Sequence, residues 1–135
     1  MITADSSVWI GYINGHRTSQ TRALDAALDD SASEIVLLDL VLMEILRGFR
    51  SERDLRLAHA ALSQLPLFTA GGESTALAAA ALYRDLRQRG ITVRSSIDLL
   101  VGAWCIRNDC ALIHADRDFD GMRDHHGLPT WSPPQ

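Results

Sequence analysis

The sequence predicts an α/β protein of three layers, α/β/α, with a central, mostly parallel sheet of four to five strands. Short apolar runs alternate along the chain with longer segments of helical spacing, and the runs are apolar at nearly every position. Strands of this kind are typical of parallel sheets with both faces covered. The 135 residues suit one domain, which we place at residues 1–130, followed by a short tail at residues 131–135.

The expected elements follow one another in a regular order. Strands are expected at residues 1–4, 34–38, 67–69 and 111–114, with a terminal segment around Thr130-Trp131. Helices are expected at residues 7–13, 19–28, 40–49, 52–64, 73–89, 95–108 and 119–125. Asp39 stands where an N-cap belongs, before the helix at 40–49. Gly90 stands at the C′ position that ends the helix at 73–89.

The composition excludes several kinds of site. All 13 basic residues are Arg, so a Walker A loop, a Schiff base and a receiver-type phosphoacceptor site, which all need Lys, are excluded. A phosphatase of the haloacid-dehalogenase type needs D-x-D near the N-terminus, where Ser7 occupies the second position. The net charge of −4 argues against a protein that holds nucleic acid by bulk positive charge.

The sequence also predicts a cytoplasmic protein with no membrane segment. No basic stretch precedes the first apolar residues, and the longest apolar run, Ala76 to Tyr83, is far shorter than the roughly 20 residues that span a bilayer. The spacing of Cys105 and Cys110 fits neither a redox C-x-x-C motif nor a zinc site. We expect both to be small buried apolar side chains.

Four carboxylates fall where a site is expected. Asp5 and Asp116 directly follow expected strands, whereas Glu44 and Asp98 lie inside apolar helices. Ligands of open α/β sheets bind beyond the carboxyl ends of the strands, so the four are expected to converge there. Each also has a structural interpretation. Asp5 could cap a turn, Asp98 could complete a capping box with Ser95, Glu44 could face solvent, and Asp116 could be one more acid in a polar loop.

Converging carboxylates repel one another and raise each other's pKa unless a cation lies between them. Oxygen ligands suit a hard divalent cation, so we expect Mg²⁺, with Mn²⁺ as the alternative. The predicted chemistry is attack of metal-activated water on a phosphodiester, a reaction that needs neither Lys nor Cys.

Four motifs in the chain resemble those of a known family. They are DSSVWI at residues 5–10, MEILRGFR at 43–50, YRDLRQRGITVRSSIDLLVGAW at 83–104 and LIHADRDFD at 112–120. In this order they resemble the PIN-domain ribonucleases, and within them the VapC toxins of bacterial type II toxin–antitoxin pairs. The resemblance covers almost the whole chain.

The resemblance implies a PIN-like fold and a metal-dependent endoribonuclease that acts on structured RNA as the growth-inhibiting toxin of its pair. It assigns catalysis and metal binding to Asp5, Glu44, Asp98 and Asp116. Ser7 and Asp118 would support these carboxylates from outside, although Ser7 could instead simply form the turn after Asp5. The alternatives are a stand-alone PIN nuclease of RNA processing and a catalytically silent PIN module that binds RNA.

The resemblance also implies partners. They are a VapB-type antitoxin, which can place a basic side chain in the acidic site, a second copy of the chain in a homodimer, and RNA, with tRNA or rRNA favoured. The apolar residues between Leu77 and Leu86 could form the dimer contact or the core.

Basic residues near the site acids are expected to hold RNA phosphates. Arg84, Arg87 and Arg94 precede Asp98 in the chain, and they form either a basic rim around the acidic site or a solvated helix face. His114 stands where many relatives have Thr or Ser. It could pack at the end of its strand or touch the substrate.

Overall fold

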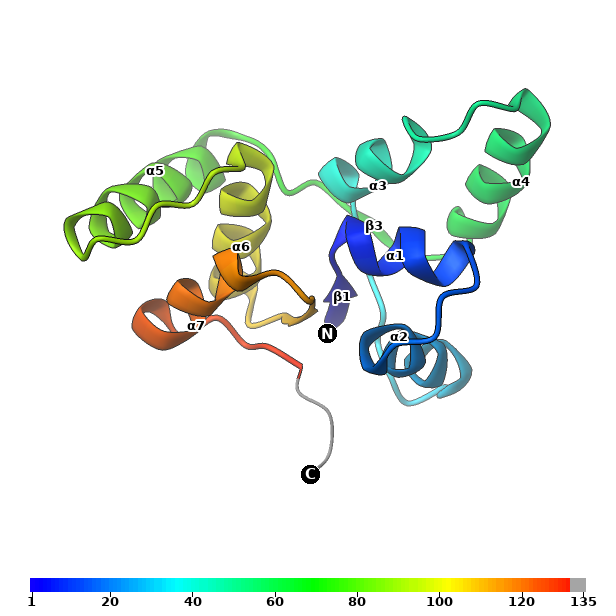
Figure 1. The fold of residues 1–135 in the computed structure, drawn as a ribbon, viewed down its shortest axis with the longest axis horizontal. Coiled ribbons are helices and arrows are strands. Elements are labelled where there is room, and N and C mark those ends of the chain that lie inside the picture. Colours follow the sequence, from blue (N-terminus) through cyan, green and yellow to red (C-terminus); the bar gives the residue numbers. More distant parts are fainter. Residues whose placement is uncertain (132–135) are drawn as a thin grey trace.

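Short strands run through the middle of the molecule with helices on both sides (Figure 1). The structure is a computed structural model, and it describes residues 1–131. The strands are β1 (Ile2–Ala4), β2 (Leu37–Leu38), β3 (Leu67–Phe68) and β4 (Ala111–Ile113). The helices are α1 (Ser6–Ile13), α2 (Ser19–Asp29), α3 (Asp39–Leu46), α4 (Glu52–Leu62), α5 (Glu73–Gln88), α6 (Ser96–Asn108) and α7 (Asp120–His126), with a 3-10 turn η1 (Arg117–Phe119) before α7.

The strands are joined in parallel, as the sequence predicts. β1 pairs with β4, and β2 pairs with β3. An isolated parallel bridge between Ile2 and Ile35 joins the two pairs, and another between Leu112 and Thr130 adds a fifth segment. The resulting order is β3, β2, β1, β4 and then Thr130. The Trp131 N–H donates to the Leu112 carbonyl over 2.9 Å. The remainder of the expected tail lies outside the described residues.

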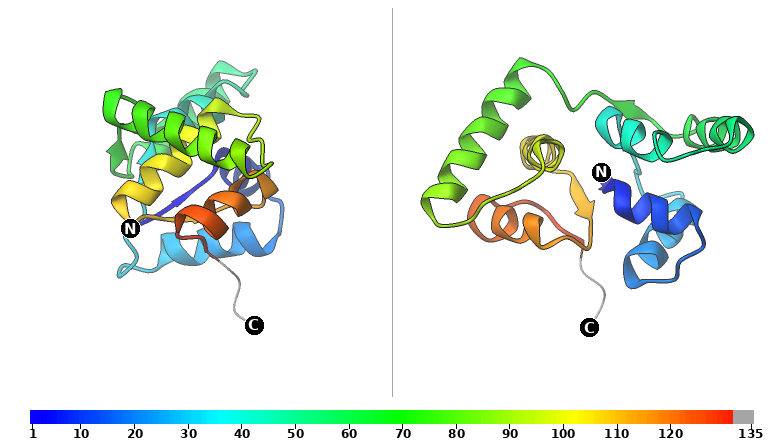
Figure 2. Two further views of the ribbon diagram at one scale, coloured as in Figure 1. Left: turned by 90° about the vertical axis from the view of Figure 1, so that its left-hand side faces the viewer. Right: turned by 45° about the horizontal axis from the view of Figure 1, so that its top comes forward.

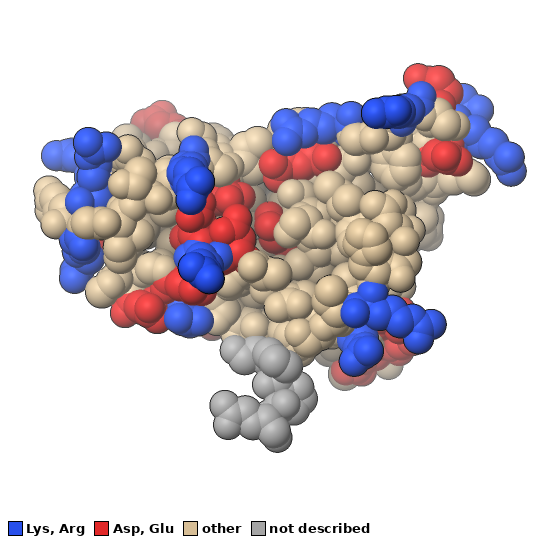
Figure 3. Space-filling model, in the orientation of Figure 1, with Lys and Arg blue, Asp and Glu red and all other residues tan. Residues whose placement is uncertain are grey.

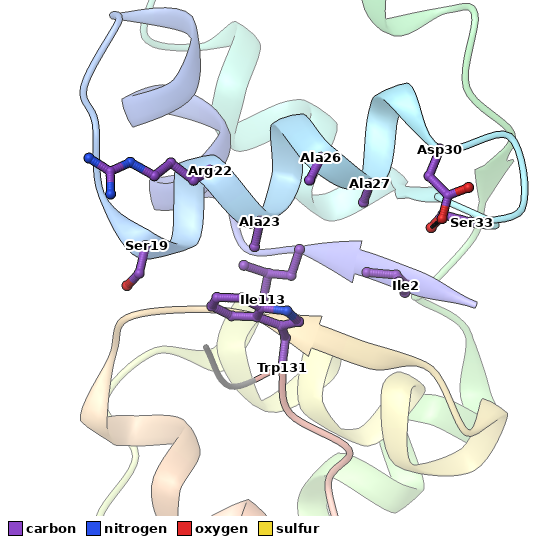
Figure 4. A pocket seen from close by; sticks show the side chains of 10 residues that line it. All are labelled: Ile2, Ser19, Arg22, Ala23, Ala26, Ala27, Asp30, Ser33, Ile113 and Trp131. Carbon is purple, nitrogen blue, oxygen red and sulfur yellow. Dashed lines mark hydrogen bonds between the residues drawn. The ribbon is translucent and has the colours of Figure 1, made fainter. Parts of the chain in front are cut away.

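Helices cover the strands from both sides. Figure 4 shows α2 lying over β1 and β4, and α6 also packs against β4. Figure 2 shows α5 outside α6, with which it shares the most extensive helix contact of the described chain. The most deeply buried side chains come from all layers and include Leu24, Leu38, Leu86, Ile113 and Phe119. Cys105 and Cys110 are free thiols and fully buried, which confirms their predicted place in the core.

The predicted role of Asp39 as an N-cap is wrong. The N-cap of α3 is Leu38, and Asp39 is the first helical residue. Its Oδ1 accepts hydrogen bonds from the N–H of Leu40 over 2.9 Å and from the N–H of Ala70 over 2.8 Å. The sequence pattern predicts that an acid stands at the start of this helix. It does not predict the bond to Ala70, because the pairing of β3 with β2 brings that distant amide to Asp39.

The helix predicted at 40–49 ends early, because α3 stops at Leu46 and Arg47 is its C-cap, whereas the other predicted ends lie within two residues of the observed ones. Ser95 caps α6 through a bond from the Asp98 N–H to its Oγ. Gly90 follows the C-cap of α5 with a φ of +81°. The apolar residues of α5 serve two surfaces, because Leu82 and Leu86 are buried whereas Leu77 is 65% exposed. No helix in the described part of the chain is long and apolar enough to cross a membrane.

Candidate active site

Asp5 lies at the carboxyl end of β1, where the sequence analysis placed it. Its N–H donates to the Ile113 carbonyl, so the pairing of β1 with β4 continues as far as the acid. Asp5 is the N-cap residue of α1, yet within the described residues its side chain makes no capping bond to that helix. Instead Oδ2 accepts a hydrogen bond of 3.0 Å from Ser7 Oγ, as expected of Ser7. Burial raises the pKa of Asp5, and the bond from Ser7 opposes this shift.

Glu44 extends from α3 toward the same region. Its side chain is only 14% exposed, so the alternative in which it faces solvent is excluded. Oε2 lies 3.7 Å from Arg47 Nη2, one turn along the helix. Oε1 is buried and has no hydrogen-bond partner among residues 1–131. A buried carboxylate oxygen without a partner is costly, and a cation is a partner that would compensate for it.

Asp98 lies in the first turn of α6 and is 9% exposed. Its N–H donates to Ser95 Oγ. A full capping box also needs a bond from the Ser95 N–H to the Asp98 carboxylate, and none is found among the described residues. Burial and then the charges of Asp5, Asp116, Glu44 and Asp118 raise the pKa of Asp98 to about 7. Its carboxylate is therefore turned into the site.

Asp116 and Asp118 complete the acidic group after β4. One oxygen from each of Asp98, Asp116 and Asp118 lies within 4.8 Å of the others. Asp116 is exposed and also caps η1, since its Oδ1 accepts from the Asp118 N–H over 2.9 Å. Asp118 was expected only to support the metal ligands, yet its carboxylate lies within the same 4.8 Å of Asp98 as that of Asp116 does. The turn η1, which the sequence pattern did not predict, brings it there.

The five carboxylates thus come together from four parts of the chain at the carboxyl ends of β1 and β4. Figure 3 shows acidic side chains gathered near the middle of one face, with Arg side chains on either side of them. The donor set fits a hard divalent cation. All of the donors are carboxylate oxygens, and one of them is buried with no partner in the part of the chain that the structure describes. The raised pKa values of Asp5 and Asp98 reflect their burial and the repulsion between the carboxylates.

His114 packs at the end of β4. Its ring lies 4.8 Å from that of Phe119, centroid to centroid, and its Nδ1 is buried with no partner in the described chain. Burial lowers the pKa of His114. This arrangement agrees with the interpretation of His114 as a packed residue.

The three arginines expected to contact RNA lie in different places. Arg94 directly precedes Ser95, the N-cap of α6, and is exposed close to Asp98 in the chain. Arg84 and Arg87 lie on the last turns of α5, whose C-terminal end Figure 1 places at the edge of the molecule, away from the end of β1. Arg87 donates to the Tyr83 hydroxyl over 3.1 Å. The structure brings together the acids but not these three arginines.

The larger hollows of the surface lie beside the site rather than in it. A hollow of about 640 Å³ lies between α1 and α4 and is lined by Trp9, Tyr12, Ile13, Leu57 and Ala61 among others. A hollow of about 490 Å³ lies under α2, where Ala23, Ala26 and Ala27 face Ile113 and Trp131 (Figure 4). Sequence reasoning missed the hollow between α1 and α4. The signal in the sequence was the large number of apolar residues on α1 and α4. Some of them, such as Ile13 and Leu57, remain exposed in the structure.

Comparison with known proteins agrees with the motifs. The sequence profile of the PIN domain matches residues 2–124. The chain is 31% identical over 120 residues to VapC ribonuclease Mb1587 of Mycobacterium bovis, covering 89% of this chain and 90% of the relative. The same values hold for ribonuclease VapC11 of Mycobacterium tuberculosis.

Solved structures show the same fold. A toxin–antitoxin complex from Klebsiella pneumoniae aligns with a TM-score of 0.73 and 17% identity, over 100% of this chain and 99% of that one. VapBC2 from Rickettsia felis, bound to a DNA fragment from the promoter, aligns with a TM-score of 0.69 and 19% identity, over 98% and 100%. Because the profile spans nearly the whole described chain and the mycobacterial relatives are 31% identical over 89% of it, this protein belongs to the PIN domain family, among the VapC ribonucleases.

Proposed function

We propose that this protein is a divalent-metal-dependent endoribonuclease and the toxin of a VapBC-type pair. The observation that carries the proposal is the convergence of acids from four parts of the chain, where the buried Glu44 Oε1 has no hydrogen-bond partner among residues 1–131. Curated relatives that are 31% identical are named VapC ribonucleases, which supports the same activity here.

The residues would divide the work according to their surroundings. Asp5, Glu44, Asp98 and Asp116 would hold Mg²⁺ or Mn²⁺, and Asp118 is close enough to Asp98 to share in this. A bound divalent cation supplies a Lewis acid that lowers the pKa of water and stabilises charge on phosphate oxygens. Ser7 would orient the Asp5 carboxylate through its hydrogen bond of 3.0 Å. Arg94, which is exposed and lies four residues before Asp98 in the chain, would hold a neighbouring phosphate of the RNA.

The test is cleavage of tRNA and rRNA with Mg²⁺ or Mn²⁺ by the wild type and by Asp5→Asn and Asp98→Asn. We expect each variant to lose at least about 100-fold in rate, the scale observed when one group that stabilises transition-state charge is removed. Asp29→Asn is the matched control, because Asp29 is an exposed acid at the end of α2. Undiminished cleavage by both site variants would refute the assignment.

Calorimetry with Mn²⁺ distinguishes a nuclease from a catalytically silent module, and the neighbouring gene distinguishes a toxin from a stand-alone nuclease. A catalytically silent PIN module would bind no metal. A stand-alone nuclease of RNA processing would bind metal and cleave RNA, yet have no cognate antitoxin encoded beside it.

An antitoxin is the partner that we propose for the hollow between α1 and α4. Structures that share this fold were solved as VapBC or toxin–antitoxin complexes, and this hollow is large and mainly apolar. It shares Ile13, Asn14, Phe49 and Asp54 with a second hollow of about 250 Å³ that also includes Gly48 and Arg50, just beyond α3. A segment of the antitoxin bound along both hollows would extend to the end of α3, the helix that carries Glu44.

The homodimer and the cytoplasmic location remain predictions. Leu77 is the exposed leucine of the α5 run in which the sequence analysis placed a dimer contact.

A further inference from the structure

The junction of α1 and α2 forms a second polar hollow, separate from the acidic site. It has a volume of about 390 Å³ and is lined by Tyr12, Gly15, His16, Arg17, Thr21, Arg22 and Asp25. We infer that this hollow binds backbone phosphates of the RNA substrate, at a point away from the bond that is cut. The inference rests on the proposed ribonuclease function.

The charges of the hollow suit a phosphate. Arg17 and Arg22 are exposed, and neither guanidinium forms an ion pair with any residue that the structure describes. Arg22 also lines one end of the alanine-lined hollow under α2, and Figure 4 shows its side chain extending outward from that helix. Among the lining residues the one acid is Asp25, whose Oδ1 accepts from the Tyr12 hydroxyl over 2.8 Å. Asp29, one turn further along α2, does not line the hollow, but its charge also acts on the pKa of Tyr12. Two lining arginines therefore face one lining acid, whose carboxylate is already hydrogen-bonded.

The backbone around the hollow is held in place. The side chains of Thr18 and Thr21 form a capping box at the start of α2. The Thr21 hydroxyl also donates to the His16 carbonyl over 2.8 Å, which ties the α1–α2 loop to the first turn of α2. Arg17 lies between these two anchors, so its backbone is fixed before any ligand binds. Because the backbone that carries both arginines is already ordered, binding a phosphate costs only the conformational freedom of their side chains.

The position of the hollow connects it to the acidic site. α1 begins directly after Asp5 and is eight residues long, so its two ends lie about 12 Å apart. Figure 3 shows a group of Arg side chains near α2 on the same face as the acidic group. One RNA strand could therefore contact both, with a few nucleotides between the cut bond and the Arg17–Arg22 hollow. This contact would add affinity that the repulsive acidic site lacks.

The experiment measures binding of a fluorescein-labelled single-stranded RNA by fluorescence anisotropy at several salt concentrations, in EDTA so that metal-dependent cleavage is suppressed. Arg17→Gln and Arg22→Gln should each reduce the dependence of log K on log [salt] by about 0.7, which is about fivefold in affinity at 0.1 M salt. Asp25→Asn should bind RNA more tightly than the wild type, because it removes a negative charge and keeps an oxygen that can accept from Tyr12. This opposite sign cannot result from a loss of folding.

Arg107→Gln is the matched control, since Arg107 is also exposed but lies at the far end of α6, where it donates to Ser74 and Thr75. Its salt dependence should equal that of the wild type. Wild-type binding by the Arg17→Gln, Arg22→Gln double variant would overturn the inference and leave the proposed ribonuclease intact. The same measurement with duplex DNA gives a second check. If the double variant lost binding to duplex DNA but bound RNA as the wild type does, the inference would be overturned too. A wild type that neither binds nor cleaves RNA would overturn both proposals.

Discussion

The surroundings of the Asp98 carboxylate strongly oppose its charge. Burial removes it from water, and four other carboxylates lie near enough to raise its pKa to about 7. Asp5 is shifted in the same direction, chiefly by burial. Raised carboxylate pKa values at one place are typical of functional sites, because a chain that only needed stability would not keep such groups together.

The pH dependence of stability follows from this pKa. Without metal, the folded chain holds a proton on Asp98 between about pH 4 and pH 7 that the unfolded chain has already released. The free energy of unfolding should therefore fall as the pH rises through this window. In EDTA, thermal denaturation should give a wild-type Tm that falls between about pH 5 and pH 7.5 by a few degrees more than that of Asp98→Asn, where each kcal/mol corresponds to about 4 °C.

Added Mn²⁺ should restore the wild-type Tm at the higher pH and leave that of Asp98→Asn nearly unchanged. Equal pH profiles for the two proteins would contradict the assignment of the proton to Asp98.

The elements that carry the acids are short, so single contacts decide their orientation. α3 has eight residues and no side-chain N-cap among the described residues. Asp39 compensates by accepting from both Leu40 and Ala70, which fastens the start of α3 to the segment after β3. Glu44 lies five residues further along the same helix. The position of a site acid thus depends on a contact with another strand.

Asp39→Ala should destabilise the protein by about 1–3 kcal/mol, because it leaves the buried Ala70 N–H without an acceptor. Asp39→Asn keeps an acceptor oxygen and should retain more of the stability. Urea denaturation measures both changes. If Asp39→Ala unfolds at the same urea concentration as the wild type, the contact with Ala70 does not hold α3.

The packing of α6 against α7 depends on Gly102. A Cβ at this position would overlap the Met122 sulfur, and both residues are buried. Gly102→Ala should therefore cost about 1–3 kcal/mol, the range of overpacked cores, despite the better helix propensity of Ala. Gly48→Ala is the control, since its Cβ would meet only the Ile45 carbonyl oxygen at 3.6 Å. Equal stability of the two variants in urea would show that Met122 moves aside freely.

At the scale of the whole molecule, the acidic site and the surface hollows occupy different places. The acids lie beyond the ends of β1 and β4, while the largest hollow runs between α1 and α4. α1 links the two, because it begins after Asp5 and contributes Trp9, Tyr12 and Ile13 to the hollow. A partner bound in the hollow is therefore close to the site without covering it directly.

The antitoxin proposal predicts a role for Leu57, which lines this hollow and is 59% exposed. Leu57→Asp should change stability by no more than about 0.5 kcal/mol, as is usual for surface positions. It should weaken binding of the cognate antitoxin at least about tenfold, because burying a leucine contributes about 1.5–3 kcal/mol. Titration calorimetry measures the affinity. Leu77→Asp, equally exposed but on α5, should bind as the wild type does, and equal affinities for both variants would place the antitoxin elsewhere.

The sequence by itself determined the class of fold, the parallel arrangement of short apolar strands and the group of acids near their carboxyl ends. These features follow from local patterns, since apolar runs, helical spacing and the residue after each strand can be read along the chain. The burial of Cys105 and Cys110 and the cap at Ser95 were determined in the same way.

Only the tertiary structure decided which residues meet across the chain. It joined Asp39 to Ala70, placed Asp118 beside Asp98, and left Arg84 and Arg87 away from the acids. It also formed the hollow between α1 and α4 and the pair Arg17 and Arg22 at a second hollow. The physical reason is that such contacts depend on the angles between short elements and on single long-range hydrogen bonds, which no periodicity in the sequence records.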